Sequence, residues 1–347
     1  MSKKILILGA NGFIGSNLTE QILREKDWHV SGFDVSDHKL EECLGHQNFD
    51  FKKGDLFDHE QWIEEKVKEA DVVLPLIAIA NPALYVSDPL LVFKLDFESN
   101  LQVIKWCVQY KKRIIFPSTS EVYGMSPDTP FDEEKSNLVL GPIHKQRWIY
   151  SCAKQMLDRV IYAYGIHEKL DYTLFRPFNW LGPKMDDVFA KKENSSRAII
   201  QFINNILYQR PIKLMDGGKQ KRCFTFIGDG VSALVKMIEN ENGAASGRIF
   251  NIGNPNNNLS IADAAQEVIS VMKEYEKYAH FAEKAKVETV ASATHFGAAY
   301  EDVKERIPSI ENAKKYLDWT PTKTFREIIK NTLDYHLIQN PGTIESD

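Results

Sequence analysis

The sequence predicts an α/β fold: a doubly wound parallel sheet with helices on both faces, and a smaller, mostly C-terminal lobe. Short apolar runs alternate with amphipathic stretches through the first half of the chain, which is the pattern of strand–helix–strand units. Three glycines at intervals of three residues directly follow the first apolar run. The alternation weakens after residue 179, where glycine, proline and charged residues become frequent, so a second lobe is expected to begin there.

The expected strands are short apolar runs, and the expected helices are longer segments in which apolar residues recur every three or four positions. The strands are expected at residues 5–8, 30–33, 49–52, the run from 72, 113–117, 172–175 and 248–252. The helices are expected at residues 16–26, 60–69, 90–109, 148–164, 195–208 and 261–275. Residues 216–222 are expected to form a polar, basic loop.

Composition and charge narrow the class of protein. The chain has 347 residues, 43% of them hydrophobic, which is enough for a core and excludes a disordered chain. Because 43 Lys and Arg residues stand against 48 Asp and Glu residues, no basic excess points to nucleic acid. The N-terminus lacks the features of a signal peptide, and no apolar run is long enough to span a membrane. We therefore expect a cytoplasmic protein without membrane contact.

The cysteines and histidines form no metal-binding pattern. The four cysteines are spread along the chain without a CxxC pair, which disfavours both a disulfide framework and a zinc site. The nine histidines form neither an HxxxH nor an HExxH pattern. No bound metal is expected, and unpaired cysteines suit a reducing compartment.

The glycine pattern predicts a dinucleotide site. Gly9, Gly12 and Gly15 lie between the first strand and the first helix, where glycines permit a tight turn and let the backbone approach a pyrophosphate. The free N–H groups at the start of the helix then face the phosphates. Asp34, 19 residues beyond Gly15, ends the second strand. A carboxylate there accepts hydrogen bonds from a ribose 2′-hydroxyl and repels a 2′-phosphate, so the predicted cofactor is NAD rather than NADP.

Four further residues complete the predicted cofactor site. Phe13 and Ile14 lie inside the glycine motif. Asp55 and Leu56 follow the third strand, where the adenine is expected. An N-cap role for Asp55 is equally open and is compatible with cofactor binding.

The predicted domains follow from the position of this site. Residues 1–178 are expected to form a Rossmann-type NAD-binding domain, to which residues 223–252 return. Residues 179–222 and 253–347 are expected to form the substrate-binding lobe. Since no linker cleanly separates the two parts, the lobes are expected to interleave.

Tyr150 and Lys154 form a Tyr-x-x-x-Lys pair on a predicted helix. At this spacing the two side chains share one helix face. A nearby ammonium favours the phenolate and lowers the pKa of the tyrosine, so Tyr150 could take a hydroxyl proton while a hydride leaves for the cofactor. The alternative, a tyrosine that merely packs on a lysine stem, is weakened by the dinucleotide motif upstream.

The segment Ser-Thr-Ser-Glu-Val-Tyr-Gly at residues 118–124 follows the strand at 113–117. Parallel sheets of this kind bind ligands at the carboxyl ends of their strands. With the glycine motif and the Tyr-x-x-x-Lys pair, this segment resembles the extended short-chain dehydrogenase/reductases that act on nucleotide sugars. The resemblance implies that Thr119 and Ser120 act beside Tyr150 and Lys154.

A closer resemblance extends over almost the whole chain. It is carried by residues 118–124, 147–154, 176–180, 195–197, 217–222 and 308–310. These segments are similar to the UDP-glucuronate decarboxylase domain of the bifunctional polymyxin-resistance proteins, which forms UDP-4-keto-pentose. Those proteins carry a formyltransferase ahead of this domain, whereas this chain starts at the dinucleotide strand, so formyl transfer is not expected. The resemblance also implies a homodimer joined by a four-helix bundle of the helices at 90–109 and 148–164.

The resemblance implies the roles of the remaining site residues. UDP-glucuronate carries a diphosphate and a carboxylate, so local cations are needed to bind it. The implied catalytic residues are Thr119, Ser120, Glu121, Tyr150, Lys154 and Arg306. The implied substrate-binding residues are Ala80, Tyr85, Thr119, Ser120, Arg147, Asn179, Arg197, Lys213, Lys219, Arg222 and Tyr300.

Ser120 bears on the type of reaction. Related sugar 4,6-dehydratases place an aspartate before the glutamate, and this pair removes water across C5 and C6. Ser120 replaces that aspartate here. A serine does not readily protonate a leaving hydroxyl, but it can donate a hydrogen bond to a substrate carboxylate that an aspartate would repel. The pair Ser120–Glu121 therefore favours decarboxylation over dehydration.

Three alternatives remain open at this point. UDP-xylose synthases share the segment Thr-Ser-Glu-Val-Tyr-Gly but return the hydride to the sugar, so no NADH is released. A nucleotide-sugar 4,6-dehydratase is disfavoured by Ser120. A non-catalytic NAD sensor is disfavoured because Tyr150, Lys154 and Thr119 are all present.

Overall fold

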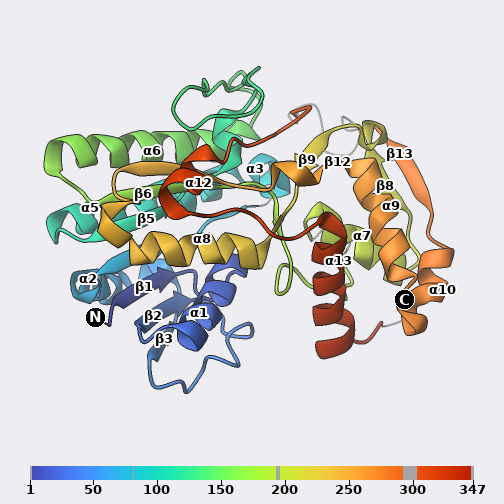
Figure 1. The fold of residues 1–347 in the computed structure, drawn as a ribbon, viewed down its shortest axis with the longest axis horizontal. Helices are drawn as coiled ribbons and strands as arrows, with labels where there is room; N and C mark the ends of the chain where they lie inside the picture. The colour runs from blue at the N-terminus through green and yellow to red at the C-terminus, as the bar shows by residue number, and fades with distance from the viewer. Residues whose placement is uncertain (1, 81, 193–195, 292–302, 345–347) are drawn as a thin grey trace.

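A seven-stranded, all-parallel sheet forms the centre of the computed structural model, which describes residues 2–80, 82–192, 196–291 and 303–344 (Figure 1). The strand order is β11-β6-β5-β4-β1-β2-β3, so the order reverses between β1 and β4. The strands are β1 (Lys4–Leu8), β2 (His29–Asp34), β3 (Phe49–Lys53), β4 (Val72–Pro75), β5 (Arg113–Pro117), β6 (Tyr172–Pro177) and β11 (Arg248–Ile252). The predicted α/β, Rossmann-type fold class is confirmed.

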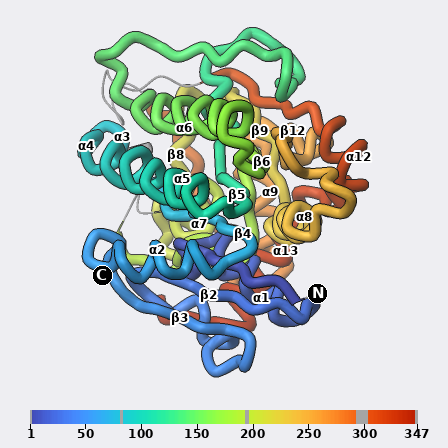
Figure 2. Tube along the Cα trace, turned by 90° about the vertical axis from the view of Figure 1, so that its left-hand side faces the viewer, coloured from blue at the N-terminus to red at the C-terminus, as the bar shows by residue number. Residues whose placement is uncertain are grey.

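Helices cover both faces of this sheet (Figure 2). The side chains of β1 alternate between the faces: Ile5 and Ile7 join one hydrophobic cluster, and Leu6 and Leu8 join the other. The first face is covered by α1 (Phe13–Glu25) and α8 (Ile227–Glu239), and the second by α2 (Glu60–Glu69), α5 (Asn100–Gln109) and α6 (Trp148–Glu168). Within the described residues, no helix combines the length and the apolar character that a membrane crossing needs.

The segment expected as one helix at residues 90–109 is helical but not uniform. After α3 (Pro82–Ser87), Asp88 accepts a hydrogen bond from the backbone N–H of Leu91 and caps α4 (Pro89–Val92). A π-helix, η2 (Phe93–Ser99), then leads directly into α5. A π-helical turn holds one more residue than an α-helical turn and often occurs at functional sites.

The smaller lobe follows β6. Its helices are α7 (Ala198–Leu207), α9 (Ile261–Met272), α10 (Glu276–Glu283) and α13 (Phe325–Leu333), which continues into a π-helix, η7 (Asp334–Gln339). Its strand pairs are β8 (Ile212–Met215) with β13 (Val287–Val290), and β9 (Lys221–Cys223) with β12 (Asn258–Ser260). The expectation of a loop at 216–222 is therefore wrong in part, because β9 begins inside that segment.

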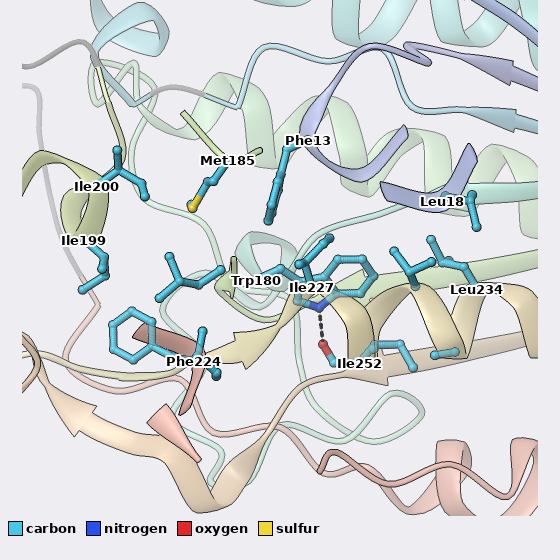
Figure 3. Packing of buried hydrophobic residues seen from close by; sticks show 14 of the residues in the cluster. Phe13, Leu18, Trp180, Met185, Ile199, Ile200, Phe224, Ile227, Leu234 and Ile252 are labelled. Carbon is cyan, nitrogen blue, oxygen red and sulfur yellow. Dashed lines mark hydrogen bonds between the residues drawn. The ribbon is translucent and has the colours of Figure 1, made fainter. Parts of the chain in front are cut away.

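The two lobes share one hydrophobic cluster, which Figure 3 shows. Phe13 and Leu18 of α1 belong to the same cluster as Ile199 and Ile200 of α7 in the smaller lobe. Two short strands, β7 (Trp180–Leu181) and β10 (Thr225–Phe226), pair in parallel at the junction, and Trp180 donates from Nε1 to the carbonyl oxygen of Ile252 at 2.8 Å. Next to β11 lies α12 (Glu311–Leu317). The domain boundary at 178 stays a prediction.

Candidate active site

The glycine loop lies where the strand order reverses. Gly9 has a φ of +87°, and a Cβ on Gly15 would lie 2.1 Å from the carbonyl oxygen of Gly9, so the helix approaches the strand too closely for any other residue. Gly12 begins α1 without a side-chain cap, and the first turn of α1 contains no acidic residue. The N–H groups of this turn are therefore available to an anion.

Asp34 is braced against the glycine loop. Its carboxylate accepts hydrogen bonds from the backbone N–H of Asn11 at 2.9 Å and of Ser36 at 3.4 Å. The Asn11 side chain in turn donates to Ser36 Oγ and accepts from the N–H of Lys39, both at 2.7 Å. Burial raises the pKa of Asp34, and these backbone hydrogen bonds offset only part of that rise. The carboxylate is thus fixed beside the loop, as a ribose-binding acid requires.

The other predicted cofactor residues take more varied positions. Asp55 caps a 3-10 helix, η1 (Leu56–Asp58), by accepting a hydrogen bond from the N–H of Phe57 at 3.0 Å, so the N-cap interpretation describes its contact here. Leu56 and Ile14 are partly buried against the core. The ring of Phe13 lies 5.0 Å from the guanidinium carbon of Arg197.

Tyr150 and Lys154 lie buried on α6. The Tyr150 ring stacks on Tyr85, with centroids 4.9 Å apart and planes 6° from parallel. A hydrogen bond joins Thr119 and Tyr150. The Lys154 ammonium lies 4.6 Å from the centre of the Phe116 ring, and it has no hydrogen-bond partner among the described residues. Such a buried, unpaired donor fits the ribose hydroxyls of a dinucleotide.

The expected direction of the Tyr150 pKa is wrong for this structure. Burial raises the pKa of Tyr150, and the negative charges of Asp96 and Glu121 raise it further. Burial also lowers the pKa of Lys154. The expectation considered the ammonium alone, whereas desolvation of the phenolate is the larger effect.

Glu121 lies between two buried arginines. It belongs to a 3-10 helix, η3 (Ser120–Tyr123), that begins directly after β5, where Thr119 Oγ1 accepts from the N–H of Glu121. Arg147 donates from Nη2 to Oε2 at 2.7 Å, and Arg306 donates from Nη1 to Oε1 at 2.9 Å. Burial alone would raise the pKa of Glu121, but Arg306, Arg147 and the more distant Arg222 lower it to about 2. Glu121 is therefore an anion held by the two arginines that contact it.

A buried polar network supports the segment before Glu121. Ser118 donates to Asp158 at 2.7 Å, and Arg176 donates to the same carboxylate at 3.3 Å. Arg176 also donates to the Tyr123 hydroxyl at 2.8 Å, which donates to Asn251 Oδ1 at 2.9 Å. The sequence analysis did not identify these supporting roles, although a polar Asn251 inside the apolar strand β11 is a visible signal.

Asn251 connects that network to the segment that carries Arg306. Its side-chain amide donates to the carbonyl oxygens of Phe131 at 3.0 Å and Ser309 at 3.1 Å. The N–H of Ser309 donates back to Phe131 at 2.8 Å, and a bridge joins Phe131 to Pro308. Arg306 is thereby held over Glu121 although it comes from the far end of the chain.

The predicted substrate residues are brought together only in part. Arg222, on β9, is buried and donates to the carbonyl oxygen of Val303 at 2.8 Å. Arg197 forms two side-chain hydrogen bonds with Asp186, at 2.9 and 3.1 Å, so it already has a carboxylate partner. Lys213 is half-buried on β8, and Lys219 is exposed after a 3-10 turn, η4 (Asp216–Gly218).

Three of the predicted substrate-binding residues, Ala80, Asn179 and Tyr300, remain to be described. Ala80 is exposed after β4. Asn179 has a φ of +42°, and its carbonyl oxygen accepts from the N–H of Thr225 at 3.2 Å. Tyr300 lies outside the described residues. No cluster of three or more metal-ligating side chains occurs in the described part of the chain, and all four cysteines are unpaired.

Fold and site together define a dinucleotide-dependent enzyme of the extended short-chain dehydrogenase type. The profile of the NAD dependent epimerase/dehydratase family matches residues 5–253, and the chain belongs to that family. The predicted cofactor, NAD, is thereby confirmed. The residues whose positions suit NAD are the glycine loop for the pyrophosphate, and Asp34 and Lys154 for the ribose hydroxyls.

Solved structures share this fold over nearly the whole chain. The PbgP3 protein from Burkholderia pseudomallei is 46% identical, with 96% of each chain covered and a TM-score of 0.88. A UDP-glucuronic acid 4-epimerase from Bacillus cereus, solved with UDP-glucuronic acid and NAD, is 23% identical, with 96% and 98% covered and a TM-score of 0.80. A dTDP-glucose 4,6-dehydratase from Bacillus anthracis is 21% identical, with 96% of each chain covered and a TM-score of 0.75.

Proposed function

We propose that this protein is an NAD-dependent decarboxylase that converts UDP-glucuronate to UDP-4-keto-pentose. The observation that carries the proposal is the group of Glu121, Arg147 and Arg306 beside Tyr150. Arg147 and Arg306 bring two buried guanidiniums to one site, and guanidiniums bind carboxylates by charge-assisted hydrogen bonds, which favours a substrate with its own carboxylate. Ser120, buried next to Glu121, can donate to that carboxylate without repelling it.

The first step is oxidation at C4 of the sugar. NAD, when bound, accepts the hydride from C4. Tyr150 takes the proton of the C4 hydroxyl, while Thr119 holds the tyrosine hydroxyl in place. Because burial raises the pKa of Tyr150, its ionisation requires nearby positive charge, and Lys154 supplies it from the same helix face.

The second step is loss of the C6 carboxylate. The new C4 ketone is β to that group, so the C5–C6 bond can break with release of CO₂ while its electron pair moves toward the C4 oxygen. The resulting enolate then takes a proton at C5. Arg306 is assigned to this proton delivery, and Glu121, fixed as an anion, orients Arg306 by their ion pair.

The lobes divide these tasks in the proposal. Residues 1–178, with 223–252, bind NAD and carry Tyr150, whereas 179–222 and 253–347 bind the UDP-sugar. Arg222 and Arg306 then reach the reacting sugar from the substrate-binding lobe.

The test is incubation with UDP-glucuronate and NAD, with NADH absorbance and the sugar product followed together by NMR. Stoichiometric NADH, CO₂ and a C4-keto or hydrated pentose support the proposal. UDP-xylose without net NADH would show that the hydride returns to the sugar, and a C4 epimer that keeps its carboxylate would contradict decarboxylation. The Tyr150→Phe variant serves as the control that should bind NAD without forming NADH.

A further inference from the structure

Asp96 is a fully buried carboxylate that neither the sequence analysis nor the proposed steps use. It lies in the π-helix η2 with no exposed surface. Its Oδ1 accepts a hydrogen bond from the backbone N–H of Ile79 at 2.8 Å. Its Oδ2 has no hydrogen-bond partner among the described residues. An unpaired buried carboxylate oxygen is costly and needs an explanation.

The π-helix places Asp96 against the end of β4. Asn100, one turn later, donates from Nδ2 to the carbonyl oxygen of Ile77 at 3.2 Å. Asp96 and Asn100 together therefore hold the backbone of residues 77–79. This segment follows β4 where the strand order reverses, which is where a sheet of this kind binds its dinucleotide.

The π-helix η2 packs against α6, and the cation electrostatically coupled to Asp96 is Lys154 of that helix. Both are buried, and both have a polar atom without a partner in the described part of the chain. Burial lowers the pKa of Lys154, and the charges that oppose this are Asp96 and Asp158. Asp158 already contacts Arg176 and Ser118, whereas Asp96 has no contacting cation among the described residues.

We propose that Asp96 is a positioning residue of the cofactor site that acts through Lys154: its buried carboxylate is the counter-charge of the buried ammonium that binds the ribose of NAD. This role depends on the NAD dependence of the family and is independent of which sugar is the substrate.

The sign of the effect follows from the charges around the pair. The charges that act on Tyr150 include Asp96, Glu121 and Asp158, all of which raise its pKa, whereas Thr119 lowers it. Removing the charge of Asp96 makes proton loss easier for Lys154 and Tyr150 alike, so both pKa values fall. Burial raises the pKa of Asp96 itself to about 6, so below that pH its charge, and with it the effect, is absent.

The first test measures the dissociation constant of NAD from about pH 5 to about pH 10. Asp96→Asn keeps an oxygen acceptor for Ile79 and removes the charge; Asp96→Ser is the second variant should the first fail to fold. In the parent protein, affinity falls at alkaline pH as Lys154 loses its proton. In the variant this fall occurs about one pH unit lower, and the two curves coincide below about pH 6.

Glu133→Gln is the matched control. Glu133 is also a buried carboxylate that accepts from a backbone N–H, at 2.8 Å from Asn251, but it is not among the charges that act on Lys154. In Glu133→Gln, the fall in NAD affinity at alkaline pH should occur at the same pH as in the parent protein. An unshifted Asp96→Asn curve, an affinity loss that is equal at every pH, or the same shift in Glu133→Gln would overturn the inference.

A second readout separates this inference from the proposed substrate. With UDP-glucuronate, both the acidic and the alkaline limbs of NADH formation should move to lower pH in Asp96→Asn. Should the parent protein form no NADH from UDP-glucuronate while the shift in NAD binding is observed, the substrate proposal fails and the role of Asp96 stands. The opposite pattern, turnover without any shift, leaves the substrate proposal intact and removes Asp96 from the site.

Discussion

Glu121 shows how neighbouring charge can outweigh burial at a single residue. Its side chain is only 17% exposed, yet the contacts with Arg147 and Arg306 bring its pKa to about 2. A carboxyl with such a pKa stays ionised at neutral pH. It can orient a guanidinium or accept a proton, but it does not act as a proton donor there.

We expect Glu121→Gln to reduce CO₂ release from UDP-glucuronate by roughly 10²- to 10⁴-fold, the usual contribution of a positioned acid–base group. The amide keeps the shape of the side chain but no longer fixes Arg306 by charge. NAD affinity should change little, because the cofactor residues are elsewhere on the sheet edge. Turnover equal to that of the parent protein, measured with labelled carboxylate, would remove Glu121 from the reaction.

Glu133 gives the opposite case, a buried carboxyl that no cation contacts within the described part of the chain. Burial raises its pKa to about 7. The pKa of Glu133 is higher in the folded state than in the unfolded state. Its contribution to the free energy of unfolding is therefore fully present below about pH 4.5 and is lost as the pH rises through about 7. The parent protein therefore loses about 3 kcal/mol of stability from this residue between acidic and alkaline pH.

Glu133→Gln should remove that loss, since glutamine is neutral and its oxygen can still accept from Asn251. The urea midpoint of the variant should match the parent near pH 5 and exceed it near pH 8. Glu134→Gln, at the exposed neighbouring position, is the control and should follow the parent at both pH values. A variant less stable than the parent at pH 8 would refute the assignment.

At the scale of elements, the join between β1 and α1 is a tightly constrained part of the site. A Cβ on Gly15 would meet the Gly9 carbonyl oxygen at 2.1 Å, so the helix must move away from the strand to accommodate any side chain. We expect Gly15→Ala to weaken NAD binding by more than about tenfold, as measured by calorimetry. Gly45→Ala is the control: its Cβ would have open space, so it should affect stability through its φ of +85° but leave NAD affinity unchanged.

The sequence analysis located the strands of the main sheet because each is a short apolar run with a turn signal at its end. It also singled out Tyr150, Lys154 and Glu121 from motifs, and Arg306 from the family resemblance. Periodicity did not reveal that the helix at 90–109 contains a π-helix, since a segment of seven residues is too short for its own period to be recognised. Asp96 therefore looked like an ordinary polar position, and its burial became visible only in three dimensions.

The direction of the Tyr150 pKa was missed for a related reason. The spacing of Tyr150 and Lys154 is a local property that the sequence shows directly. The desolvation of both side chains depends on Tyr85, Phe116 and other residues that arrive from different elements. The pKa of a buried group depends on the packed structure. Motif spacing alone therefore identified Lys154 as the neighbour of Tyr150 but gave the wrong direction for the shift of the Tyr150 pKa.

At the scale of the whole molecule, the site depends on contacts between distant parts of the chain. Glu121 follows β5 of the main sheet, whereas Arg306 lies in the C-terminal part of the smaller lobe, near Ser309, which Asn251 holds. Since the two lobes also share one hydrophobic cluster, they are coupled by packing as well as by hydrogen bonds (Figure 3). The proposed reaction requires residues from both lobes.

The last prediction, a homodimer, concerns the outer surface of α4, α5 and α6. Figure 2 shows α4, α5 and α6 together on one side of the molecule. Large apolar side chains are exposed there: Leu90 at 75%, Ile166 at 61%, Tyr162 at 54% and Met156 at 51%. Such a patch on paired helices suits a second copy of the same surface, which would form a four-helix bundle.

We expect a dimer in sedimentation at micromolar concentration, and a monomer for the double variant Met156→Glu, Ile166→Glu, because two buried glutamates on each helix would be desolvated without partners. Ile338→Glu is the matched control, since Ile338 is also 61% exposed but lies on η7, away from α6. A parent protein that sediments as a monomer, or equal dissociation by the control, would contradict the bundle. A dimer that persists in the double variant would place the interface on another face.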